Sequence, residues 1–152
     1  MSLESDIRVL RQVPFLSGFG DEHLRLLAFG GENRRYRTGQ AIFRQGESAD
    51  GGMVVLHGQV RIPATRDGSD DESGDVYSTG TLFGQRALLA RSVRSHSAIA
   101  DTSVEALLIR RTLFRRVLTE FPDLAGQLHA QLSAELNDLT ERAARSVRKM
   151  AD

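Results

Sequence analysis

The sequence predicts a mainly β domain with helices at both ends, and two patterns carry that prediction. Between residues 34 and 111, short apolar runs alternate with glycines, which is typical of a sandwich, jelly roll or barrel built from short strands. Before and after this stretch, apolar residues recur at helical spacing instead. The chain of 152 residues is long enough to bury a core without disulfides or metals, so we expect one domain over residues 1–152.

Two helices are predicted within residues 1–32. The first is a short amphipathic segment at residues 6–10 that stops near Pro14. The second is expected to be capped by Asp21 and to end at the glycine pair 30–31. Its apolar side is predicted to carry Leu24, Leu26, Leu27 and Phe29.

The β region is predicted over residues 33–110. Strand-length apolar runs occur at residues 41–43, 53–56, 60–62, 76–77, 97–99 and 104–109. Residues 65–75 are polar and hold five acidic residues, so we interpret them as a hairpin tip. Their spacing does not match a calcium-binding loop, and we expect no metal there.

The C-terminal region, residues 111–150, is predicted to be helical. Apolar residues 113–114 and 117–118 indicate one short helix, and Pro122 lies near the start of a helix about 28 residues long. One narrow apolar stripe runs along the long helix: Leu124, Leu128, Leu132, Leu136, Leu139, Ala143, Val147 and Met150. The stripe either covers the core of its own domain or pairs with a second copy. We favour a homodimer, because the last two turns extend past a core of this size.

Residues 82–98 have the arrangement that a phosphate needs. A strand ends at Phe83-Gly84, a one-turn helix is expected around residues 87–89, and Arg94 stands at the mouth of the next strand. The start of a short helix offers free backbone N–H groups and the positive end of its dipole. The arginine adds a forked, permanently charged group.

This segment resembles the phosphate-binding cassette of the cyclic nucleotide-binding domain family, whose pattern is Phe-Gly-Glu-x-Ala-Leu followed, after a gap, by Arg-Ser/Thr/Ala-Ala. Residues 83–88 and 94–95 match it, residues 39–47 resemble the family's Gly-Glu-x-Ile-Phe-x-x-Gly-Asp, and residues 49–58 resemble its Ala-Asp hairpin. The resemblance covers roughly residues 6–140. It implies an eight-stranded β-roll or jelly roll with N-terminal helices, a long C-terminal helix and a cassette at residues 82–98.

The resemblance also implies roles for individual residues. Arg94 would pair with the cyclic phosphate, and the backbone N–H groups of Ala87 and Ser95 would hold its oxygens. Gly84 and Gln85 would face the ribose 2′-OH. The implied ligand is cAMP, with cGMP left open. Many cGMP-binding members carry threonine at the position of Ser95, and a serine there does not settle the choice.

Three further points concern the base and two departures from the pattern. The resemblance places Leu139 and Thr140 of the long helix near the adenine. Gln85 stands where most members have glutamate; an amide accepts the 2′-OH less strongly than a carboxylate, so we expect an affinity about fivefold lower. His96 stands where alanine is usual, and we expect its side chain to point away from the ligand, the alternative being an additional contact to the phosphate.

No enzymatic motif is present, and we expect neither a catalytic role nor a metal or cofactor beyond the nucleotide. The chain has no cysteine, and its four histidines do not form a ligand-spaced pair. Ser95 and His96 are adjacent and would point to opposite faces of a strand, so they form no dyad. The net charge is zero, and neither a secretory signal nor a membrane-spanning run is found, which predicts a cytoplasmic chain that does not bind membranes.

Two alternatives remain open beside a cyclic-nucleotide sensor. The chain could be the regulatory half of a catabolite-activator-type transcription regulator; the sequence ends directly after the long helix, and without a helix-turn-helix we expect no specific DNA binding by this chain alone. It could also be a degenerate domain that dimerises without binding a ligand. For a working sensor, the resemblance implies that ligand draws the cassette inward and that residues 111–118 reposition the long helix.

Overall fold

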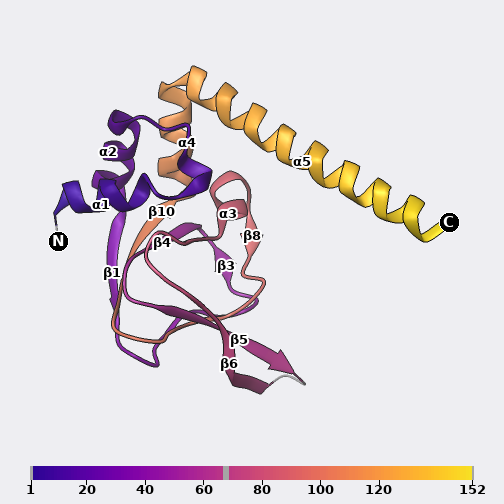
Figure 1. The fold of residues 1–152 in the computed structure, drawn as a ribbon. Coiled ribbons are helices and arrows are strands. Elements are labelled where there is room, and N and C mark those ends of the chain that lie inside the picture. The colour runs from indigo at the N-terminus through magenta and orange to yellow at the C-terminus, as the bar shows by residue number, and fades with distance from the viewer. Residues whose placement is uncertain (1, 67–68, 152) are drawn as a thin grey trace. The chain divides into compact units, whose positions relative to one another are not determined.

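The computed structural model describes residues 2–66 and 69–151, with side chains described outside residues 65–73 and 146–151. In these ranges it contains ten strands, five α-helices and one 3-10 turn (Figure 1). The chain divides into two compact units, Met1–Val117 and Leu118–Asp152. The first unit holds all the strands, which confirms the predicted β-roll with N-terminal helices.

The N-terminal region forms three helical elements: α1 (Leu3–Leu10), η1 (Pro14–Leu16) and α2 (Asp21–Gly30). The prediction that Asp21 caps α2 is wrong. Gly20 precedes the helix in an extended conformation, and its N–H donates to Nδ1 of His23 at 3.0 Å. Asp21 is the first helical residue and pairs instead with Arg11.

Only part of the predicted apolar side of α2 is buried. Leu24 and Leu27 are buried as expected, together with Ala28. Leu26 is 37% exposed and Phe29 is 81% exposed. These two residues are three positions apart and share a neighbouring face of the helix, which turns away from the sheet.

The strands form two four-stranded sheets and one short pair, and every pairing is antiparallel. The first sheet has the order β1 (Glu32–Tyr36), β10 (Val104–Arg110), β4 (Gly51–His57) and β7 (Leu82–Phe83). The second has the order β2 (Ala41–Phe43), β9 (Ala98–Ala100), β5 (Val60–Arg66) and β6 (Ser69–Tyr77). The short pair joins β3 (Ser48–Ala49) to β8 (Ser92–Val93).

The expected number of eight strands is too low for the described residues. The strands β3 and β8 have two residues each, which is too short to leave a periodic signal in the sequence. β1 was not predicted as a strand because its sequence, Glu-Asn-Arg-Arg-Tyr, is polar; its register with β10 holds it in the sheet. The predicted hairpin tip at 65–75 belongs largely to the strands β5 and β6, and residues 67–68 lie outside the described part.

The main core lies between the two sheets. Its buried residues are Tyr36, Phe43, Met53, Val55, Val60, Phe83, Ala98, Ala100, Val104, Ala106 and Leu108. On the other side of the first sheet, α1 contacts β4 and α2 contacts β10. Strand β4 therefore has buried residues on both faces, and it reads as a continuous apolar run rather than an alternating one.

The helix α4 (Arg111–Glu120) follows β10 directly, and within the first unit its Phe114 is fully buried. The ring of Phe114 stacks on Phe15 at 5.8 Å and on Phe19 at 5.7 Å between ring centroids. Aromatic pairs of this kind add about 0.5–1.5 kcal/mol beyond their buried area. They fix the first half of α4 to the N-terminal helices.

The second unit is dominated by α5 (Pro122–Ala151), a helix of 30 residues with Pro122 at its first position, as predicted. Along its apolar stripe, Leu124 and Leu128 are buried, whereas Leu136 and Leu139 are 65% and 60% exposed. The predicted stripe residues Val147 and Met150 lie outside the described side chains. No helix in the described part of the chain is long and apolar enough to cross a membrane.

Candidate ligand-binding site

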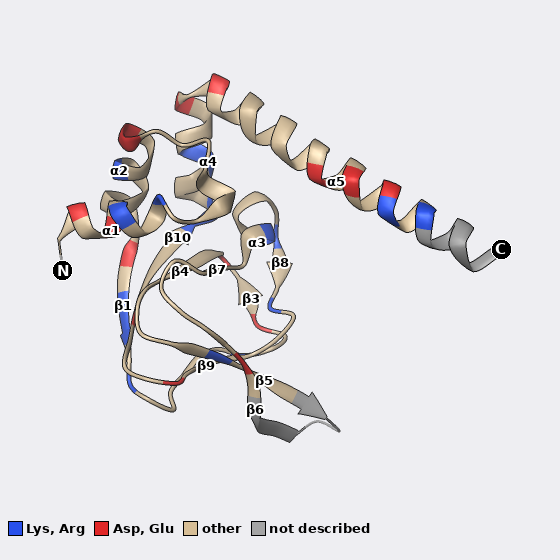
Figure 2. Ribbon diagram, in the orientation of Figure 1, with Lys and Arg blue, Asp and Glu red and all other residues tan. Residues whose placement is uncertain are grey.

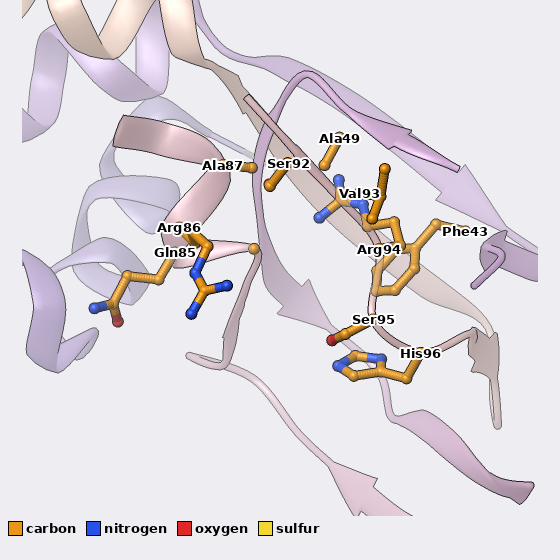
Figure 3. Close-up of a pocket in the computed structure, with 11 residues that line it drawn as sticks. Phe43, Ala49, Gln85, Arg86, Ala87, Ser92, Val93, Arg94, Ser95 and His96 are labelled. Atoms are coloured by element: carbon orange, nitrogen blue, oxygen red, sulfur yellow. The ribbon is translucent and has the colours of Figure 1, made fainter. Parts of the chain in front are cut away.

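A pocket of about 390 Å³ opens in the first unit, at the short helix α3 (Gln85–Leu89) and the end of β8 (Figure 3). This volume lies within the range of about 300–1,000 Å³ that small-molecule sites occupy. The lining residues are Phe43, Ala49, Gly84, Gln85, Arg86, Ala87, Ser92, Val93, Arg94, Ser95 and His96. The pocket thus unites all five residues predicted to hold the phosphate and ribose.

Gly84 is the residue on which the local geometry depends. It precedes α3 with φ +83°, in the left-handed region that favours glycine. A Cβ atom at this position would overlap Nη1 of Arg94 and would approach the carbonyl oxygen of Gly51 to 3.0 Å. The absent side chain therefore lets the α3 turn and the Arg94 guanidinium lie against each other.

Ala87 is fully buried, and its N–H donates to the carbonyl of Gly84 at 2.9 Å within the first turn of α3. That bond closes the turn which presents the cassette to the pocket. The expected bond from Ala87 N–H to a ligand oxygen stays a prediction. Ser95 is exposed at the pocket, where its hydroxyl is accessible to a ligand.

Arg94 is 9% exposed and forms one side of the pocket. Its Nη2 donates to the carbonyl of Gly51 at 3.2 Å, and its guanidinium lies 4.4 Å above the ring of Phe43. Its Nη1 is buried without a hydrogen-bond partner, and no ion pair joins Arg94 to any residue in the described ranges. Burial lowers the pKa of Arg94, which Glu47 and Asp50 partly counteract.

A buried cation with an unbonded N–H is costly. Leaving such a group unsatisfied costs about 1–3 kcal/mol, and more when it is charged. An anion in the pocket would supply both the missing acceptor and the missing charge. The arrangement around Arg94 therefore suits the binding of a small anionic group. The described residues do not give this arginine a carboxylate partner within the fold.

The prediction that His96 points away from the ligand is wrong. It rested on strand alternation, but residues 95–96 form a bend between β8 and β9, where alternation does not apply. The imidazole is half-buried and lines the pocket, with ring centroids 5.7 Å from Phe43 and 6.2 Å from Phe83 (Figure 3). His96 therefore narrows the pocket beside Ser95.

Gln85 and Arg86 begin α3, and both are exposed and line the pocket. Figure 3 shows the Gln85 side chain extended away from Arg94, while Arg86 projects from the same turn into the open space beside it. The sequence identified Gln85 by the family pattern. It gave no signal for Arg86, which occupies a position that the pattern leaves free.

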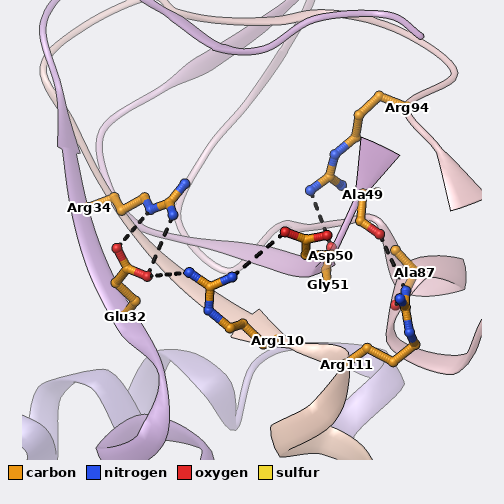
Figure 4. A network of polar contacts seen from close by, with 9 residues as sticks. All are labelled: Glu32, Arg34, Ala49, Asp50, Gly51, Ala87, Arg94, Arg110 and Arg111. Atoms are coloured by element: carbon orange, nitrogen blue, oxygen red, sulfur yellow. Dashed lines mark hydrogen bonds and ion pairs between the residues drawn. The ribbon is translucent and has the colours of Figure 1, made fainter. Parts of the chain in front are cut away.

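Two arginines of α4 bind the backbone of the cassette (Figure 4 shows Arg111). Nη1 of Arg111 donates to three carbonyls, those of Ala49 at 3.3 Å, Ala87 at 3.1 Å and Ala90 at 3.3 Å. Nη2 of Arg115 donates to the carbonyl of Leu89 at 3.1 Å. Cations are stabilising at the C-terminal end of a helix, where carbonyls lack partners. These bonds tie α3 to α4, and sequence reasoning missed them because no pattern predicts which backbone carbonyls an arginine will reach.

A charged network lies beside Gly51 (Figure 4). Glu32 accepts from Arg34 at 3.2 Å and from Arg110 at 2.9 Å, and these bonds lower the pKa of its carboxyl group. Arg110 also pairs with Asp50 at 3.7 Å. Asp50 is thus engaged by Arg110 and leaves Arg94 without a carboxylate in contact.

The residues expected near the base lie in the second unit. Leu139 and Thr140 are both exposed, and the Thr140 hydroxyl donates to the carbonyl of Leu136 in the preceding turn. A contact between either residue and a bound base stays a prediction. Among the described residues, no group of three or more His, Cys, Asp or Glu side chains could hold a metal ion.

A β-roll with a helical turn that begins after a glycine, and with a buried arginine that forms no ion pair with the described side chains, defines a domain whose pocket suits a small anionic ligand. Residues 33–121 match the model of the cyclic nucleotide-binding domain. The chain belongs to that family.

Curated relatives and solved structures agree with this assignment. The cyclic AMP receptor protein of Thermus thermophilus is 30% identical over 125 residues, which cover 82% of this chain and 58% of that protein. A cGMP-dependent protein kinase of Drosophila melanogaster is 28% identical over 137 residues, which cover 88% of this chain and 18% of the kinase. A cyclic nucleotide-binding-like protein from Brucella abortus has 36% identity and a TM-score of 0.68, covering 75% of this chain and 97% of that one. The chain spans less than two thirds of both curated relatives.

Proposed function

We propose that this domain binds a cyclic nucleotide in the pocket around Arg94 and serves as the ligand-sensing part of a regulatory protein, without catalysis of its own. The observation that carries the proposal is the buried Nη1 of Arg94, which has no hydrogen-bond partner and belongs to a side chain that lines a pocket of about 390 Å³. The cyclic phosphate would accept from this nitrogen. The Ser95 hydroxyl and the start of α3 would complete its coordination, and Gly84 and Gln85 would face the ribose.

We favour cAMP over cGMP as the ligand. Ser95 stands at the position where many cGMP-binding members of the family carry threonine, and the preference rests on that difference, although serine, like threonine, carries a hydroxyl group. The relatives do not decide between the two nucleotides, because one is named for cyclic AMP and another for cGMP. Comparison of the two nucleotides at equal concentration on the same protein is therefore part of the test.

The test is thermal unfolding of the wild type, Arg94→Ala and Arg91→Ala, each with and without cAMP or cGMP. At a hundred times Kd a bound ligand adds about 2.7 kcal/mol, which raises Tm by roughly 5–11 °C for a chain of this size. We expect that rise in the wild type and in the exposed-arginine control Arg91→Ala, with a larger rise for cAMP at equal concentration. Arg94→Ala should fold, since it removes a buried charge that Glu47 and Asp50 only partly compensate, yet show no rise.

Two results would contradict the proposal. If neither nucleotide at millimolar concentration raises Tm of the wild type, the pocket is degenerate and the domain has lost its ligand. If Arg94→Ala keeps the full rise, the nucleotide binds elsewhere. A larger rise with cGMP would retain the site and reverse the preference.

We further propose that the domain acts as a homodimer through α5 and that ligand binding repositions α5. The exposed leucines at positions 136 and 139 support the first statement, and the bonds from Arg111 and Arg115 to the cassette support the second.

A further inference from the structure

The charge of the pocket exceeds what one cyclic phosphate needs. Its lining includes two guanidinium groups, Arg86 and Arg94, and no aspartate or glutamate. The acidic residues near Arg94, Glu47 and Asp50, line a separate small cavity to which Arg94 also contributes. The charge of Arg94 is therefore partly offset by carboxylates outside this pocket, whereas Arg86 forms no ion pair with any described side chain.

Arg86 also differs from several nearby arginines in having no bonding partner among the described side chains. Arg110, Arg111 and Arg115 all bond to carboxylates or backbone carbonyls within the fold. For the guanidinium of Arg86, no hydrogen bond or ion pair occurs with any residue whose side chain is described, that is, outside residues 65–73 and 146–151. Figure 3 shows this side chain directed from α3 into the open space that faces Ser95 and His96.

We propose that Arg86 is a second phosphate-binding cation, which approaches the ligand from α3 while Arg94 approaches from the end of β8. This inference rests on the proposed cyclic-nucleotide function and adds a determinant of affinity to the same site. A phosphate offers several acceptor oxygens, and the arginine fork binds two of them at once. The contact from Arg86 thereby offsets part of the loss in ligand affinity that we expect from Gln85 in place of the usual glutamate.

The two arginines differ in their dependence on salt. Arg94 is buried, so salt hardly screens it, whereas Arg86 is exposed and is screened strongly at high ionic strength. An exposed pair of charges contributes only modestly to binding, which corresponds to an effect of up to about fivefold in Kd. Arg86 should therefore act mainly at low salt and should make the affinity depend on ionic strength.

The experiment is isothermal titration calorimetry with cAMP, and with cGMP in parallel, at two salt concentrations. The proteins are the wild type, Arg86→Gln, Arg86→Lys and the control Arg91→Gln, which removes the same charge from an exposed residue just beyond α3 and outside this pocket. We expect Arg86→Gln to raise Kd about fivefold at low salt and much less at high salt. Arg86→Lys should lie near the wild type, and Arg91→Gln should match it.

The outcomes separate this inference from the proposed function. If the wild type binds a cyclic nucleotide but Arg86→Gln and Arg91→Gln have equal affinities at low salt, Arg86 is not a ligand residue, and the function stands without it. If the affinity of Arg86→Gln falls equally at both salt concentrations, a screened charge is not the cause and the inference is also wrong. If the wild type binds neither nucleotide, both proposals are overturned.

Discussion

At the scale of single residues, Gly84 and Arg94 form one unit. The turn into α3 needs the positive φ of Gly84. The Arg94 guanidinium occupies the space that a Cβ atom on Gly84 would take. Strain and steric overlap are separate effects here, and another glycine makes it possible to separate them. Gly39 has φ +86°, but an added Cβ there would meet nothing within 4 Å.

We predict that Gly84→Ala and Gly39→Ala both lower the free energy of unfolding by about 1 kcal/mol, because both force alanine into the left-handed region. Only Gly84→Ala should also weaken cAMP binding, by tenfold or more, since its methyl group displaces Arg94. Chemical denaturation and calorimetry measure the two quantities. Equal affinities in the two variants would show that Arg94 does not need this space.

Asp6 is the other residue with an unusual environment. It lies buried on α1, its Oδ1 has no hydrogen-bond partner, and burial, with a contribution from Glu105, raises the pKa of its carboxyl group, while Asn33 opposes the shift. A carboxyl group whose pKa is raised in the folded state destabilises the fold when ionised. The penalty is present above the folded pKa and disappears as pH falls through it.

Asp6→Asn should therefore stabilise the protein by about 1 kcal/mol at neutral pH, with the gain shrinking as the solution is acidified. Glu4→Gln is the control, because it removes the same charge from an exposed position of the same helix, where Glu4 pairs with Arg25. Urea denaturation between neutral and mildly acidic pH provides the comparison. A gain that is independent of pH would mean that ionisation of Asp6 is not its source.

At the scale of elements, the sequence predicts best where burial leaves a pattern. The runs that became β2, β4, β9 and β10 are apolar because both sheets bury them, and α3 and α5 are found by helical spacing or by the cassette pattern. Strand β1 is polar and, apart from Tyr36, not buried, so nothing local distinguishes it from a loop; its pairing with β10 exists only in the fold. The same holds for β3 and β8, which are two residues long.

The candidate site shows the same division. Arg94, Gly84, Gln85, Ala87 and Ser95 are consecutive or nearly so in the cassette, and they line one pocket as predicted. The bend that turns His96 inward and the carbonyl contacts of α4 depend on backbone placement. Neither residue spacing nor composition encodes that placement directly.

We predict that the bonds from Arg111 to the cassette transmit ligand binding to the helices that follow. The chain has no cysteine, so spin labels can be placed at His57→Cys and Glu135→Cys, two exposed positions in β4 and α5. Double electron-electron resonance should show a different distance distribution with cAMP than without it. Arg111→Gln should reduce that difference, while the exposed control Arg116→Gln should preserve it. Identical distributions with and without ligand would refute the movement of α5.

At the scale of the whole molecule, the two proposed activities lie in different compact units. Every residue that lines the pocket belongs to Met1–Val117, and the exposed leucine stripe belongs to Leu118–Asp152. Substitutions in one unit can therefore be tested against the function of the other. A stripe variant that still binds cAMP, and an Arg94 variant that still associates, would show that sensing and self-association are separable.

The last prediction concerns that association. Leu136 and Leu139 are more than half exposed, and burying a leucine contributes about 1.5–3 kcal/mol. Four such leucines in a symmetric pair contribute roughly 6–12 kcal/mol, comparable to the 4–15 kcal/mol that association costs. Replacing both by glutamine should therefore convert a dimer into a monomer in sedimentation equilibrium. Ala134→Gln, on the opposite face of α5, should remain dimeric. A wild type that is monomeric at high micromolar concentration would refute the homodimer.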